Sequence, residues 1–124
     1  MTRRTTIDAS TTAALRREHL AALDVLSVAH DQVRQVLDDA TTALAAVRTH
    51  LEQGRMISDL PDLLEPKTVR TSLSRSLDEL ERARHRSQRA LFRMLEAEGQ
   101  RKSDIARICG VSRQLVSRII HEPD

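Results

Sequence analysis

Aromatic residues are almost absent from this chain of 124 residues: Phe92 is the only one, and there is no Trp or Tyr. This scarcity argues against a β-sandwich or barrel, whose strands draw on aromatic and β-branched residues. It also argues against an aromatic-lined ligand pocket or a base-stacking RNA platform. The single cysteine excludes an intramolecular disulfide, and three glycines and three prolines are too few for a loop-rich fold.

Long hydrophobic runs are missing as well. No stretch approaches the ~18 apolar residues of a membrane span, and no signal peptide is visible. We therefore expect no membrane contact and a cytoplasmic location. The residues that are abundant, above all Ala, Leu, Arg, Glu and Asp, favour helices, so the composition predicts an all-α protein.

Positive charge is concentrated in the second half of the chain. Residues 1–64 contain 7 basic and 9 acidic residues, whereas residues 65–124 contain 13 basic and 9 acidic ones. All but two of the cations are Arg, whose planar guanidinium suits contacts with phosphates and guanine. A polyanionic partner is therefore expected to meet the C-terminal half.

The three glycines each follow a segment with helical periodicity, where a glycine commonly ends a helix. They predict helices over 10–53, 67–98, 102–109 and 112–121. Residues 1–9 are interpreted as a flexible arm, and residues 54–66 as a connection in which 60–64 could form one short turn.

The first predicted helix carries a heptad pattern, which is typical of a coiled-coil seam. Ala22, Ala29, Val36 and Ala43 widen this apolar stripe on one side, as in a helical bundle. The seam residues that we expect to mediate dimerisation are Leu23, Leu26, His30, Val33, Leu37, Leu44, Val47 and Leu51, with Ala40 on the same seam.

The second predicted helix is apolar only near its start, at Val69, Leu73, Leu77 and Leu80. This stripe is too short to cover the seam of the first helix, so a second copy of the chain is the simplest cover, giving a homodimer. Residues 81–89 contain four arginines and almost no apolar face. They are interpreted as a basic neck between a helical dimerisation region, 10–80, and a C-terminal domain, 90–124.

Residues 102–121 read KSDIARICGVSRQLVSRIIH, and this segment resembles the helix-turn-helix of bacterial DNA-binding regulators. Ala106 stands where the two helices cross closely, and Gly110 stands in the turn, where a positive φ is needed. Ser103 and Ser112 are expected to cap the two helices. Ile105, Cys109, Val111, Val116 and Ile119 are expected to form the core, with Leu91 and Leu95 from the preceding helix. The predicted fold is thus a long coiled-coil-like hairpin followed by a C-terminal helix-turn-helix.

The resemblance implies which side chains face DNA. Arg113 could pair with guanine and Gln114 with adenine, because each offers two matched hydrogen-bonding groups to a base edge. The expected base-reading residues are Ser112, Arg113, Gln114, Ser117 and Arg118. At the start of the preceding helix, the expected phosphate contacts are Arg101, Lys102 and Ser103. Arg86 and Arg89 are added as phosphate contacts because arginines are dense in the neck beside the motif.

No catalytic constellation is visible: the sequence has no glycine-rich phosphate loop and no nucleophile with a recognisable base. The five histidines share no metal-ligand spacing, so we expect neither a metal nor another cofactor. His30 is interpreted as a polar seam residue that sets the pairing, and Cys109 as a packed core thiol. We do not expect an enzyme.

Two functions remain open at this point. The first is a dimeric transcriptional regulator or repressor that binds double-stranded DNA by sequence and associates with the nucleoid. The second is a helical interaction protein, such as a partition adaptor, an antitoxin or a sigma-like factor. There the motif would tether the chain to DNA, and residues 15–51 would bind a protein partner.

Overall fold

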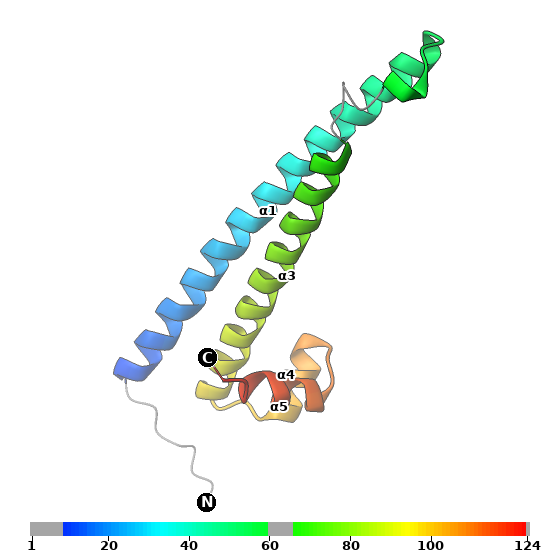
Figure 1. Ribbon diagram of the computed structural model, residues 1–124. Helices are drawn as coiled ribbons and strands as arrows, with labels where there is room; N and C mark the ends of the chain where they lie inside the picture. Colours follow the sequence, from blue (N-terminus) through cyan, green and yellow to red (C-terminus); the bar gives the residue numbers. More distant parts are fainter. Residues whose placement is uncertain (1–8, 60–65, 124) are drawn as a thin grey trace, which may run out of the picture. The chain divides into compact units, whose positions relative to one another are not determined.

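The computed structural model describes residues 9–59 and 66–123, and this part of the chain is helical without any strand. Its elements are α1 (Ala9–Glu52), the short 3₁₀ helix η1 (Ile57–Asp59), α3 (Pro66–Ala97), α4 (Lys102–Cys109) and α5 (Arg113–Ile120) (Figure 1). The all-α prediction is confirmed, and each helix boundary lies within one residue of its predicted position. The expected arm, except Ala9, and the expected turn over 60–64 lie outside the described residues.

The described residues group into two compact units. One contains α1 up to Leu26 together with everything from Ala83 onward, and the other contains Ser27–Arg82. The start of α1 therefore belongs with the C-terminal helices. The predicted division into a dimerisation region, a neck and a DNA-binding domain is a functional one and stays a prediction.

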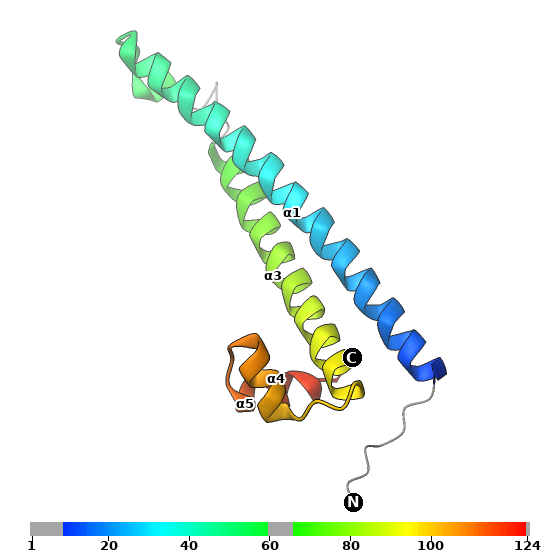
Figure 2. The same ribbon diagram turned by 180° about the vertical axis from the view of Figure 1, so that it is seen from behind.

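In the first unit, the start of α1 packs antiparallel to the end of α3 (Figure 2). The Glu18 carboxylate lies 3.8 Å from the Arg93 guanidinium, and His19 Nδ1 lies 3.2 Å from Met94 Sδ. These contacts fix a register in which Ala22, one turn further along α1, lies opposite Ala90. Both alanines are buried, because side chains of this size let the two helices approach closely.

The inward face of α1 shares one of its two rows of residues with the predicted seam. The other row is shifted by one position along the sequence. Leu26, Val33, Ala40 and Val47 are half-buried, as expected, but Leu23, His30, Leu37, Leu44 and Leu51 are exposed. Their place is taken by the smaller residues of the widening stripe, Ala22, Ala29, Val36 and Ala43. Small residues suit a closely packed hairpin, whereas leucines would hold the helices apart.

The predicted neck has a more definite inward face than its sequence suggests. Ala83 and Ser87 are buried, and Ala90 follows them at the next inward position. Residues 81–89 therefore keep an inward face of small residues, although their sequence has almost no apolar face.

His50 closes the inward face of α1 in the second unit. It is buried, and its Nε2 lies 3.3 Å from the Met56 carbonyl oxygen, while the Arg55 guanidinium lies 3.4 Å from its Nδ1. The turn after α1 therefore folds back over the end of the helix. This places Met56 at the level of His50 along the helix axis.

We predict that Ala22→Leu lowers the free energy of unfolding by about 1–3 kcal/mol, because the larger side chain must separate two closely packed helices. Ala21→Leu is the matched control, since Ala21 is exposed on the same helix. Urea titration followed by circular dichroism measures both variants. Equal stability of the two variants would contradict the close packing at Ala22.

Candidate nucleic-acid interface

Phe92 is at the centre of the C-terminal core and is fully buried. This side chain comes from α3 and packs with residues of α4 and α5. The buried cluster consists of Phe92, Ile105, Ala106, Val116, Ile119 and Ile120, with Leu95, Cys109, Val111 and Leu115 packed against it. Leu91 and Leu95 were the residues expected from α3, and Phe92 was missed, although its being the only aromatic residue in the sequence was an available signal.

The connection between α4 and α5 has the expected turn geometry. Gly110 ends α4 with φ 68°, a left-handed conformation that favours glycine, and its N–H donates to the Ala106 carbonyl. The Val111 N–H donates to the same carbonyl at 3.0 Å. Ala106 is buried where the two helices pack together. The expected roles of Ala106 and Gly110 in the turn are therefore confirmed.

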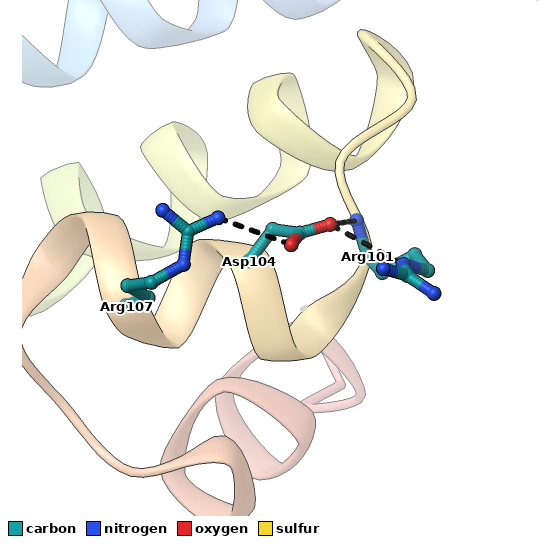
Figure 3. Close-up of polar contacts among 3 residues, drawn as sticks. All are labelled: Arg101, Asp104 and Arg107. Carbon is teal, nitrogen blue, oxygen red and sulfur yellow. Dashed lines mark hydrogen bonds and ion pairs between the residues drawn. The ribbon is translucent and has the colours of Figure 1, made fainter.

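The two helix starts are capped differently. Ser112 caps α5 as expected: its Oγ accepts the Leu115 N–H at 3.0 Å. The expectation that Ser103 caps α4 is wrong, because the residue at the N-cap is Arg101. There the Asp104 carboxylate accepts the Arg101 backbone N–H at 3.1 Å (Figure 3).

Asp104 also organises two basic side chains. Its carboxylate lies 3.3 Å from Arg101 Nε and 3.2 Å from Arg107 Nη2 (Figure 3). The Arg101 backbone hydrogen bond, followed by the bonds from Arg107 and Arg101, holds the pKa of Asp104 below its ordinary value of 3.8. The carboxylate thus remains charged and keeps both guanidinium groups at the start of α4.

The five expected base-reading residues lie at and just after the start of α5. Arg113, Gln114 and Arg118 are exposed, whereas Ser117 is half-buried. Ser112 is exposed too, but its hydroxyl already accepts the capping hydrogen bond. Gln114 and Arg118 lie on the side of α5 opposite Val116, Ile119 and Ile120, which hold the helix in the core. Arg113 lies on the same side as Ile120 and is exposed because it is the first residue of the helix. The helix therefore presents a polar, basic surface on a fixed support.

One cleft brings the expected phosphate contacts and a base-reading residue together. It has a volume of about 420 Å³ and is lined by Glu96, Gln100, Arg101, Lys102, Ser103 and Arg113. Lys102 Nζ lies 3.6 Å from the Glu96 carboxylate, and its side chain is half-buried. The start of α4 and the start of α5 thus share one cleft with three cationic side chains.

The other two expected phosphate contacts differ in exposure. Arg86 is exposed, but Arg89 is half-buried and its guanidinium donates to the backbone carbonyl of Glu122. His85 Nε2 lies 2.7 Å from the Glu122 carboxylate. This hydrogen bond lowers the pKa of Glu122. Arg89 and His85 therefore tie the segment after α5 to α3.

No family model, curated protein or solved structure matches this chain. Within residues 9–59 and 66–123, no group of His, Cys, Asp or Glu side chains could hold a metal ion. In the same part of the chain, no helix is both long and apolar enough to cross a membrane.

We predict that Asp104 stabilises the protein in a pH-dependent way. Because its pKa is lower in the folded state, its contribution is fully present above about pH 3.8 and is lost as the pH falls through the lowered pKa. The melting temperature of Asp104→Asn should be below that of the wild type at pH 6. The difference should shrink below pH 3.8. Glu98→Gln, at an exposed acid just after α3, is the control, and a difference for Asp104→Asn that does not change with pH would contradict the argument.

Proposed function

We propose that this protein binds double-stranded DNA in a sequence-specific manner through α4 and α5, and that it acts as a dimeric transcriptional regulator or repressor. The observation that carries the proposal is the surface of α5. Gln114 and Arg118 are exposed on the face of α5 opposite the core around Phe92, and Arg113 is exposed at the start of the same helix. A helix supported in this way is suited to insertion into a major groove.

The chemistry of these side chains suggests how bases are read. The Arg113 guanidinium can donate two parallel hydrogen bonds to guanine O6 and N7, and the Gln114 amide can pair with adenine N6 and N7. Both residues are in the first turn of α5, the part of a recognition helix that contacts base edges. Each such pair discriminates against a wrong base by about 1–3 kcal/mol.

The neighbouring cleft supplies the contacts that do not depend on sequence. Arg101 and Lys102 face it together with Arg113, so a phosphate there would sit close to the base-reading residue. Lys102 and Arg101 would exchange their carboxylate partners, Glu96 and Asp104, for phosphate oxygens. These exposed ion pairs are weak, so the exchange costs little.

A helical interaction protein tethered to DNA is the second candidate. It is favoured by the exposed leucines of α1, including Leu37, Leu44 and Leu51, which a protein partner could cover. A partner that copurifies in a fixed ratio and protects residues 15–51 from proteolysis would support this function. A purified chain that binds a defined DNA site without any partner supports the regulator.

We predict that Arg113→Ala weakens binding to a site selected from random DNA by about 1–3 kcal/mol and relaxes the preference at one base pair. Fluorescence anisotropy on the selected site and on single-base variants measures both effects. Arg17→Ala removes an exposed arginine from α1 and is the control. Unchanged affinity and sequence preference in Arg113→Ala would contradict the assignment of α5 as the recognition helix.

We predict a different result for Arg101→Ala. Loss of a phosphate contact should weaken binding to all sequences alike and reduce the slope of log affinity against log salt by about 0.9. Anisotropy titrations at four salt concentrations, on the selected and on a scrambled site, test this. A loss confined to the selected site would instead assign Arg101 to base reading.

A further inference from the structure

The second unit exposes four leucines along one edge of its helical hairpin. Leu37, Leu44 and Leu51 are 48%, 69% and 45% exposed, and they follow one another at intervals of seven residues on α1. Seven residues advance the helix by about 10.5 Å and return to nearly the same side. Leu77 on α3 is 47% exposed.

Leu37 and Leu77 belong to the same edge. Each directly follows a half-buried inward residue, Val36 on α1 and Ser76 on α3. In an antiparallel helix pair, the positions that directly follow corresponding inward positions lie on the same side of the pair. The exposed leucines therefore form a single apolar edge, here called the leucine edge (Leu37, Leu44, Leu51 and Leu77).

We propose that a second copy of this chain covers the leucine edge, with the α1 helices of the two copies antiparallel and Leu44 at the two-fold axis. In this register Leu37 packs against the partner's Leu51, and the reverse pair forms by symmetry. The proposal deepens the dimer of the proposed function by assigning its face, direction and register. It depends on no contact with DNA.

The charges beside the leucines favour the antiparallel direction. Arg34 and Arg48 flank the leucines on one side, and Asp38 and Glu52 lie next to them on the same side of α1. Within one copy, Arg34 pairs with Asp31 at 3.2 Å and Arg48 with Glu52 at 2.8 Å, both as exposed and therefore weak ion pairs that a partner's carboxylate can join or replace. With Leu44 at the two-fold axis, Arg48 and the partner's Asp38 differ in level along the helix axis by only two residues. Arg34 comes within two residues of the partner's Glu52. In a parallel pair in register, this charged side of one helix would lie against the other side of its partner, so these ion pairs could not form.

The turn after α1 completes the cover of the leucine edge. Met56 is exposed and lies at the level of His50, because His50 Nε2 contacts the Met56 carbonyl oxygen. In the antiparallel register, the partner's Met56 therefore reaches the level of Asp38, close to Leu37 and Leu77. The partner's Met56 would thus cover Leu37 and Leu77, the part of the leucine edge that the partner's α1 does not cover by itself.

Cysteine crosslinking of the full-length chain tests the register, in a Cys109→Ser background whose folding is checked by circular dichroism. Leu44→Cys should form disulfide-linked dimers with itself. Leu37→Cys and Leu51→Cys should each crosslink poorly alone and efficiently when mixed. Thr42 is exposed, but it lies two residues from Leu44 and therefore on another side of α1. Thr42→Cys is the control and should stay monomeric on the gel. Efficient crosslinking of Leu37→Cys alone and of Leu51→Cys alone would overturn the antiparallel arrangement.

A charge swap provides an independent readout by sedimentation of the otherwise unmodified protein. Arg48→Glu should weaken dimerisation about fivefold or more, because two symmetric ion pairs become repulsive. Asp38→Arg added to Arg48→Glu should restore the wild-type affinity of the dimer. A monomeric wild type at micromolar concentration, or no restoration, would overturn the interface. Anisotropy on a single half-site reports DNA binding separately, so a failed interface and a failed proposed function give different results.

Discussion

The burial of Phe92 is the contact on which the C-terminal part of the molecule depends. Two helices of eight residues are too short to be stable by themselves in water, and the apolar residues that they share are few. Phe92 adds the largest side chain of this core from α3, a helix of 32 residues. The position of α5 is thus set by a side chain outside the two-helix motif.

Near the start of α4, two acidic side chains form ion pairs with the basic side chains around them. Asp104 holds Arg101 and Arg107 near the start of α4, and Glu96 does the same for Lys102. The same carboxylates reduce repulsion among the closely spaced positive charges in the absence of a ligand.

Much of the local structure could be predicted from the sequence, because it depends on local chemistry. Glycine at a left-handed position, a serine hydroxyl at a helix start and a small residue at a crossing each act through near neighbours, so Gly110, Ser112 and Ala106 were assigned correctly. The inward face of α1 could not be predicted, because hydropathy ranks Leu23 above Ala22 and does not separate Leu37 from Val36. The distance between the helices decides that choice, and it depends on both helices together. Phe92 was missed although its being the only aromatic residue was a usable signal. Asp104 was missed because it acts from inside the helix: its carboxylate accepts the N–H of the N-cap residue Arg101, so no serine is needed there.

The small residues between α1 and α3 have a consequence for how this sequence can change over evolutionary time. At Ala22 and Ala90 almost any replacement is larger, so these positions are expected to drift little. The exposed leucines can be replaced without disturbing the hairpin. A replacement would, however, require a matching change in any surface that covers them. Related chains would therefore keep their alanines while their outward leucines diverge, and the dimer that we propose would then form only between copies from the same lineage.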